Sequence, residues 1–206
     1  MKKCKNCGKQ FEPSNTIQSV CGLKCALKVS AAKTKQKEIE KKKLNLKLKE
    51  SLKTLGDYKK ELQIEVNKIV RLIDEGCKCL ACGVTNAKFD ASHFRGVGAW
   101  DNLRFNLHNI YSGCARCNTY QNGNLIKFRE GIIETFGDSQ MAYMDDLNVI
   151  YPIVKLNKDE LAERTKIAKK IVKELIELNK LAKLPRNADE RITLRTKFNK
   201  MLDIYL

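Results

Sequence analysis

Eight of the nine cysteines in this chain fall into four close pairs, the grouping expected of metal ligands. The two N-terminal pairs lie thirteen residues apart and the two central pairs thirty-one residues apart. Each set of four thiolates can bind one zinc ion tetrahedrally. We therefore predict two structural zinc sites. Their ligands are Cys4, Cys7, Cys21 and Cys25 in the N-terminal site and Cys79, Cys82, Cys114 and Cys117 in the central site; Cys77 is left over.

The segment between the central cysteine pairs carries a histidine and an asparagine that suit phosphodiester hydrolysis. An imidazole can take a proton from water near neutral pH, so we expect His93 to be the general base. Asn109 does not titrate, and we expect its amide to tie the loop to the preceding hairpin and hold His93 in place. The competing interpretation is that His93 is buried in a zinc-ribbon core, or donates to a phosphate without catalysis.

Hydrolysis of this kind also uses a divalent ion that neutralises the scissile phosphate and the leaving oxygen. We expect Mg²⁺ or Mn²⁺, which prefer oxygen ligands. Asn118 and, one helical turn later, Asn122 each offer an amide oxygen. Both follow the last central cysteine pair, so the zinc site would place them near the hairpin.

Three local elements must position these groups. Residues 89–94 alternate like a short strand, residues 103–107 read as the returning segment, and Cys117-Asn118 opens a helix. A hairpin, an asparagine loop and a helix, stapled by four cysteines, resemble the HNH endonucleases, whose fold is called ββα-metal. In that resemblance His93 matches the first histidine, Asn109 the central asparagine and Asn118 the last position.

The resemblance also bears on the alternative base and on the first ligand of the divalent ion. His108 is the other candidate base, but it adjoins Asn109 where the family pattern has no histidine. The family usually places a carboxylate or histidine immediately before the base, and here that residue is Ser92. Asp90 has the same strand parity as Ser92, so its carboxylate could serve the same face. We expect Asp90 to be the ion's first ligand; otherwise Asn118, Asn122, water and phosphate oxygens hold it.

The charge balance indicates a polyanionic partner. Lysine and arginine number 40 against 24 acids, a net charge of +16, which favours nucleic acid or an anionic membrane surface. No apolar run reaches the roughly 18–20 residues that span a bilayer, and the N-terminus lacks a secretory signal. We expect an intracellular protein whose cysteines are reduced. The residues expected to contact DNA phosphates are Arg95, Arg104, Arg116, Lys41, Lys42 and Lys43.

The fold class predicted is α+β and mainly helical. We expect an N-terminal zinc finger (1–28), a lysine-rich helical arm (29–75), the zinc-stapled ββα-metal core (76–137) and C-terminal helices (138–206). Gly56-Asp57 reads as a break between two helices, with Asp57 as the cap of the second. An apolar seam at heptad-like spacing follows, formed by Leu62, Val66, Ile69 and Ile73 and extended upstream by Leu48, Leu52 and Leu55.

Such a seam is most often an intramolecular core face, and the alternative is a short coiled coil that makes a homodimer. Downstream, residues 124–136 read as a helix ended by Gly137, and a short helix is expected over 139–147. Asn157 caps a long amphipathic helix, and a last helix follows Pro185. The apolar positions of these two helices are Leu161, Ala168, Ile171, Leu175, Leu178 and Ala182, then Leu194, Phe198, Met201 and Tyr205.

Taken together, the finger, the lysine-rich helix, Cys79-x2-Cys82-Gly83, Asp90-Ala-Ser-His93 and Cys114-x2-Cys117-Asn118 resemble the NinG (Rap) recombination proteins of lambda-type bacteriophages. The resemblance covers residues 1–145 and implies an endonuclease that nicks branched DNA such as D-loops and Holliday junctions in the cytoplasm of an infected bacterium. Phage or host recombination proteins would then be further partners.

Two other functions remain open on the residues alone. One is a zinc protein that binds DNA or RNA without catalysis, which Ser92 in place of an acid favours. The other is a homing or restriction-type nuclease that reads sequence; it would need base-edge contacts, whereas lysine suits contact with the phosphate backbone.

Overall fold

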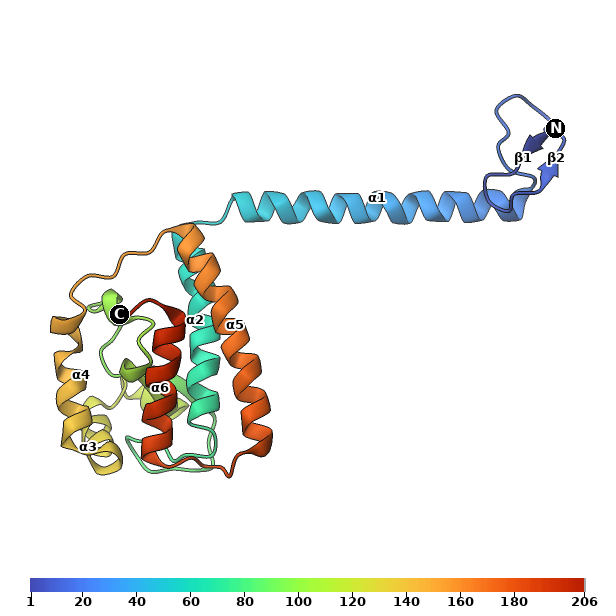
Figure 1. Cartoon of the computed structure of the whole chain (residues 1–206). Coiled ribbons are helices and arrows are strands. Elements are labelled where there is room, and N and C mark those ends of the chain that lie inside the picture. Colours follow the sequence, from blue (N-terminus) through green and yellow to red (C-terminus); the bar gives the residue numbers. More distant parts are fainter. Residues whose placement is uncertain (206) are drawn as a thin grey trace. The chain divides into compact units, whose positions relative to one another are not determined.

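The computed structural model describes residues 1–205 and divides into two compact units, Met1–Lys53 and a second that begins at Thr54 (Figure 1). This division differs from the predicted arm over residues 29–75. The first of the two helices predicted there stays with the zinc finger, whereas the second packs into the core of the larger unit. In the described part of the chain, no helix combines the length and the apolar character needed to cross a bilayer.

The first unit consists of a small cysteine-rich fold and one long helix. Strands β1 (Lys2–Lys3) and β2 (Gln10–Phe11) pair antiparallel, and helix α1 (Leu23–Ser51) follows. None of the residues of α1 is buried, and Leu44, Leu46 and Leu48 are each more than half exposed. The helix therefore has no apolar face covered by this unit, as its high lysine content predicts.

The break between the two helices lies earlier than predicted. α1 ends at Ser51, and α2 (Leu55–Ile73) begins after Thr54, whose hydroxyl accepts from the Asp57 N–H at 3.2 Å. The Asp57 carboxylate in turn accepts from the Thr54 N–H at 2.9 Å, which completes a capping box. Asp57 therefore contributes to the cap from the third helical position and is not the cap residue itself.

The second unit is mainly helical and contains one hairpin. Its helices are α2, α3 (Leu125–Phe136), α4 (Asp138–Ile150), α5 (Lys158–Leu181) and α6 (Ala188–Leu202), and its strands are β3 (Phe89–His93) and β4 (Ile110–Cys114). Three short turns are η1 (Asp101–Leu103), η2 (Leu107–Asn109) and the π-helical η3 (Arg116–Tyr120). This is the predicted mainly helical α+β class.

The hairpin forms a layer between two groups of helices. β3 and β4 pair antiparallel, with Phe89 opposite Cys114 and His93 opposite Ile110. Ile110 belongs to an apolar cluster with α2, α5 and α6, and Tyr111 belongs to one with α3 and α4. Successive residues of a strand point to opposite faces, so β4 is buried on both sides.

The second strand of the hairpin begins seven residues later in the chain than predicted. Residues 103–107 do not form a strand; β4 begins at Ile110. Leu103 is buried against α3 and α4, whereas Phe105 and Leu107 are buried in the cluster with α2, α5 and α6. The alternation in the sequence therefore reflects a loop that packs into two cores.

The predicted apolar faces are confirmed for most of their positions in the second unit and are wrong for those in the first. The four positions of the α2 seam are fully buried, whereas its upstream extension is wrong, with Leu48, Leu52 and Leu55 exposed by 56%, 71% and 41%. Gly137 ends α3, and Asn157 caps α5 through a capping box with Glu160. On α5 and α6 the buried predicted positions are Leu161, Ala168, Ile171, Leu175 and Phe198. The prediction is wrong for Leu178 and Met201, each 38% exposed, and for Ala182, which is also exposed, while Leu194 is half-buried.

A buried ion pair joins α2, the hairpin and α6. Asp74 directly follows α2, and its side chain and that of Arg195 are both 0% exposed. Arg195 donates to the Asp74 carboxylate at 2.7 and 2.8 Å, and Arg191 donates to it at 2.9 Å. The N–H of Ser112 on β4 also donates to it, at 2.8 Å. Burial alone would raise the pKa of Asp74, but the two guanidinium groups lower it below its usual range.

We expect Asp74→Asn to lower the free energy of unfolding by about 3–5 kcal/mol, because it leaves a buried arginine without its counter-charge. The pKa of Asp74 is lowered in the folded state, so this contribution is complete above the unfolded pKa of about 4 and declines as the pH falls through the folded value. Urea unfolding of both proteins at pH 7, where the cysteines can retain zinc, measures the effect. Glu134→Gln, which breaks an exposed pair with Lys78, is the control and should change little. Equal free energies of unfolding for the wild type and Asp74→Asn at pH 7 would contradict the stabilising role of this ion pair.

Candidate metal centres and hairpin site

The four central cysteines converge as the spacing predicts. Their sulfur atoms all lie within 4.8 Å of one another, and those of Cys82 and Cys114 are 3.6 Å apart. Sulfurs bound to one zinc ion at about 2.3 Å lie about 3.8 Å apart, so the cluster fits tetrahedral zinc. The Cys114 N–H donates to the sulfur of Cys79 at 3.4 Å. Burial raises the pKa of the Cys79 thiol. Hydrogen bonds from the N–H groups of Cys114, Cys82 and Ala81 outweigh the effect of burial and lower this pKa below its usual range.

The N-terminal cysteines form a second cluster with the same geometry. The sulfur of Cys21 lies 3.6 Å from those of both Cys7 and Cys25, and all four sulfurs are within 4.8 Å of one another. The N–H of Cys7 is the main cause that lowers the pKa of Cys4 to about 6. A thiolate near neutral pH suits metal binding. Both cysteine groups can therefore hold zinc, as the sequence predicted.

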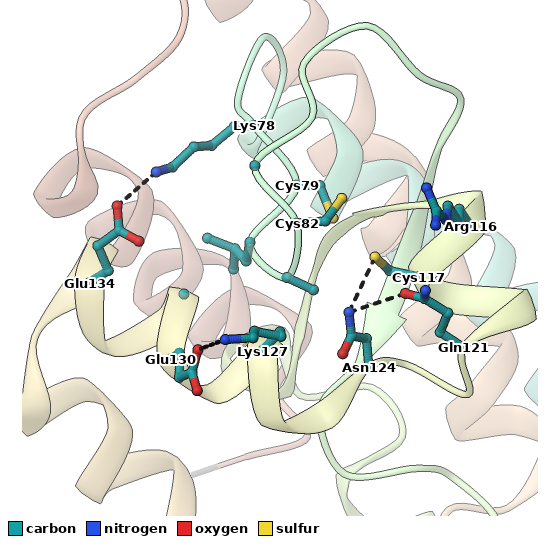
Figure 2. A pocket seen from close by; sticks show the side chains of 14 residues that line it. Lys78, Cys79, Cys82, Arg116, Cys117, Gln121, Asn124, Lys127, Glu130 and Glu134 are labelled. Atoms are coloured by element: carbon teal, nitrogen blue, oxygen red, sulfur yellow. Dashed lines mark hydrogen bonds and ion pairs between the residues drawn. The ribbon is translucent and has the colours of Figure 1, made fainter.

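The central cluster sits directly against α3. The carbonyl oxygen of Leu80 lies 1.8 Å from the position that a Cβ at Gly131 would occupy, so any side chain there would collide with backbone. The pocket between α3 and the segment that carries Cys79 and Cys82 has a volume of about 570 Å³ (Figure 2). Asn124 lines it and donates to the sulfur of Cys117 at 3.7 Å. Metal binding at the cysteines would thus fix the hairpin to the first turns of α3.

Two of the three cations in this pocket are already paired. Lys78 contacts Glu134 and Lys127 contacts Glu130, at 2.8 and 2.7 Å (Figure 2). Arg116 has no ion pair within residues 1–205 and is exposed. Of the cations in the pocket, Arg116 is the one most readily available to a phosphate.

His93 is held in one orientation by a backbone carbonyl. Its Nε2 lies 2.9 Å from the oxygen of Arg104. A carbonyl can only accept, so Nε2 carries the proton and Nδ1 is left unprotonated, which is the atom that could accept a proton. Burial lowers the pKa of His93, and the nearby Arg104 charge adds to this, while the hydrogen bond to the carbonyl opposes it; the net pKa is below the usual 6.5. The ring is therefore neutral at pH 7.

Asn109 closes the loop that carries this carbonyl. Its Oδ1 accepts from the Arg95 N–H at 2.8 Å, and its Nδ2 donates to the carbonyls of Arg95 and Leu103 at 3.0 and 3.3 Å. Its own carbonyl accepts from the Phe94 N–H at 2.8 Å. Asn109 is 0% exposed. The geometry agrees with the predicted framework role, since Asn109 fixes both ends of the loop next to His93 and Arg104.

The oxygens predicted to bind a divalent ion are brought together only in part. Ser92 donates to the Oδ1 of Asn118 at 2.5 Å, so the position before the histidine faces this asparagine directly. Asn122 is exposed on the turn after η3. Asp90 is half-buried opposite Gly113, and within residues 1–205 it makes no side-chain hydrogen bond. The helix predicted to open at Cys117-Asn118 is instead the π-helical turn η3, and α3 begins at Leu125.

His108, the other candidate base, is a structural residue. It is 4% exposed, and its ring nitrogens contact Gln140 at 3.3 Å and Thr196 at 3.2 Å. Burial, with the charge of Arg195, lowers the pKa of His108 to about 3. Its ring packs edge-on against Tyr143. Both ring nitrogens of His108 are therefore engaged, whereas the Nδ1 of His93 makes no hydrogen bond within residues 1–205.

The residues predicted to contact DNA differ in availability. Arg95 pairs with Asp145 at 3.2 Å and lies over the ring of Trp100, and Arg104 pairs with Asp101 at 2.6 Å. These two guanidinium groups would have to exchange internal partners for a phosphate. Arg116 is exposed, as are Lys41, Lys42 and Lys43 on α1.

Two contacts in this site left no signal in the sequence. The carbonyl of Arg104 is a backbone group, so the hydrogen bond that orients His93 has no residue type attached to it. The hydroxyl of Ser92 reads as a missing acid, although it contacts Asn118. The cysteine spacing, in contrast, was enough to place both clusters.

We expect the purified protein to contain two equivalents of zinc. We expect Cys117→Ser to unfold the larger compact unit, which contains the hairpin. A structural zinc contributes on the order of 10 kcal/mol, more than a domain of this size can lose. Elemental analysis and circular dichroism measure the two effects. Cys25→Ser is the matched control, because its cluster lies in the other compact unit; it should lose one zinc and leave the larger unit folded. Protein that folds without bound metal would contradict the assignment.

Comparison with known proteins places the chain in a family. The family model described as "Bacteriophage Lambda NinG protein" matches residues 1–178. The proteins named ninG of Escherichia phage lambda and Salmonella phage P22 are each 32% identical over 155 residues, which cover 66% of this chain and 76% of each relative. That of Escherichia phage 933W is 33% identical over 153 residues, with the same coverage. No solved structure matches. The chain therefore belongs to the NinG family of bacteriophage proteins.

Proposed function

We propose that this protein is a metal-dependent DNA endonuclease that nicks branched recombination intermediates, with His93 as the general base. The observation that carries the proposal is the single orientation of His93. Its Nε2 is bound by the Arg104 carbonyl at 2.9 Å, which leaves an unprotonated Nδ1 in a neutral ring. A histidine that is merely buried needs no free nitrogen, and His108, with both nitrogens in contact, illustrates that case.

In the proposed reaction His93 accepts a proton at Nδ1 from the water that attacks the phosphodiester. Positive charge then develops on the ring, and the Nε2–H bond to the Arg104 carbonyl strengthens with it. Asn109 keeps that carbonyl in place by holding its neighbour Leu103. A correctly placed base of this kind accelerates such reactions by about 10²–10⁴-fold.

The divalent ion supplies charge neutralisation at the scissile phosphate. Asn118, Asn122 and Asp90 are the proposed ligands, each with an oxygen that suits Mg²⁺ or Mn²⁺. Asn118 fits best, because it lies beside the strand position that precedes His93. Asp90 is two residues further along that strand, on the same face, and its carboxylate has no internal partner within residues 1–205.

The charge distribution supports contact with the DNA backbone. Residues 33–60 hold 11 lysines and 4 acids, and α1 presents its side chains to solvent along its length. Lysine contacts to phosphates are independent of sequence, which suits an enzyme that recognises the shape of a junction. Arg116, which is exposed beside the central cluster, is a further proposed phosphate contact.

The experiment that tests the proposal is cleavage of a labelled four-way junction in Mg²⁺ by the wild type and by His93→Ala. We expect nicking by the wild type and a loss of at least 100-fold in the variant, because the base is removed. Binding of the same junction and zinc content should be unchanged, which separates lost chemistry from lost folding. Tyr120→Ala, a change at a residue 83% exposed, is the control and should cut normally.

Two results would contradict the proposal. Equal cutting by the wild type and His93→Ala would remove His93 from the chemistry. Tight binding of the junction without any nicking, in Mg²⁺ or Mn²⁺, would favour the second candidate function, a non-catalytic DNA-binding accessory protein. The observation that favours this candidate is Ser92, which stands where the HNH pattern that this chain resembles usually has a carboxylate or histidine.

Asp90→Asn should lower the cleavage rate steeply while junction binding persists, because the ion would lose a charged ligand. Ser92→Asp in that background should restore part of the rate, since position 92 directly faces Asn118. The rate is measured over a titration of Mg²⁺. A wild-type rate in Asp90→Asn at every concentration would show that Asp90 is not a ligand, and Ser92→Ala is the control for loss of the Asn118 contact alone.

A further inference from the structure

We propose that α6 and the residues after it position the base: Asn199 and Tyr205 hold the segment 102–110, and through it the tautomer and orientation of His93. The inference rests on the proposed function only where cleavage is measured. Residues 102–110 run from within the turn η1 to the first residue of β4 and include both groups that fix His93, the Arg104 carbonyl and Asn109.

Tyr205 holds the first part of this segment. Its hydroxyl donates to the carbonyl of Asn102 at 2.9 Å and accepts from the N–H of Phe105 at 3.1 Å. These two backbone groups flank Arg104, whose carbonyl binds His93 on Nε2. Tyr205 is 5% exposed and packs edge-on against Tyr151. Because the hydroxyl bridges both sides of Arg104, it constrains where that carbonyl points.

Asn199 and Arg195 hold the second part. Asn199 accepts from the Leu107 N–H at 2.9 Å and donates to the side chain of Asn106 at 3.1 Å. Arg195 donates to the Leu107 carbonyl at 3.1 Å and is itself fixed by Asp74. Both the N–H and the carbonyl of Leu107 are therefore hydrogen bonded to side chains of α6. Leu107 is the first residue of the turn η2, which ends at Asn109.

These contacts are more specific than packing alone requires. Apolar burial would be satisfied by Phe198 and Leu202, which belong to the core on the same helix. The polar groups of α6 and Tyr205 instead meet four separate backbone groups of the segment, at Asn102, Phe105 and Leu107. The family match ends at residue 178, before α6 begins, so this support comes from a part of the chain outside the matched region.

The test uses the fact that the chain has only two histidines. In the wild type, nitrogen-15 correlation spectra of the histidine rings should show His93 as a single Nε2–H tautomer, assigned by its loss in His93→Gln. Tyr205→Phe and Asn199→Ala should each broaden or shift this signal toward a mixture of tautomers. Junction cleavage should fall by about tenfold in each, while the dissociation constant for the junction stays within about twofold of the wild type.

Thr165→Val is the matched control. It removes a buried hydroxyl whose only hydrogen bond within residues 1–205, at 2.7 Å, is to Leu161 in α5, so it perturbs the same core without touching the segment. Its His93 signal should match the wild type. Thermal unfolding of the three variants shows whether their losses of stability are comparable.

The outcomes separate the two proposals. A wild-type His93 signal in both Tyr205→Phe and Asn199→Ala overturns the positioning role, whatever the rates are. The same disturbance in Thr165→Val also overturns it, because the effect would then be general loosening of the core. A disturbed signal in the two variants, with no cleavage by any protein including the wild type, leaves the positioning role intact and removes the nuclease.

Discussion

A hairpin of two five-residue strands is too small to be stable by itself, and everything proposed for this molecule depends on how that hairpin is held. One end is closed by the four central cysteines, whose backbone donors and spacing suit zinc. The other end is held by Asp74 and Arg195, which bring α2 and α6 onto β4 and η2. The groups of interest lie between these two fixed points. His93 is at the end of β3 that the ion pair secures, and Asn118 follows the end that the cysteines secure.

The burial of that ion pair has a consequence for the site. A buried carboxylate beside two arginines is costly unless every hydrogen bond is made, and here Asp74 also accepts from Ser112. Such a network has few alternative arrangements, because moving any partner leaves a buried charge unpaired. We infer that this network holds α6 in one position against the segment 102–110. The Arg104 carbonyl, which lies in that segment, is then also held in one orientation.

The sequence predicted the parts whose residue types are tied to their chemistry. Cysteine spacing predicted both clusters, the apolar stripe from Leu62 to Ile73 predicted the buried face of α2, and Asn157 predicted the start of α5. It failed where one pattern has two physical causes. Leu103, Phe105 and Leu107 alternate as a strand does, yet they enter two different cores from a loop. The leucines of α1 continue the spacing of α2, but nothing in their own unit covers them. Asp74 and Arg195, which lie far apart in the chain, gave no sign that they meet.

We propose that this hairpin site cuts DNA and that the protein recognises the shape of the DNA through contacts with its phosphate backbone. The most direct measurement compares cleavage in Mg²⁺ of two substrates with the same sequence, one a linear duplex and one a four-way junction. The account predicts nicks near the branch point of the junction and little cutting of the duplex, unchanged when the sequences of the arms are permuted. Equal cutting of both substrates, or cuts that follow one sequence wherever it is placed, would contradict it.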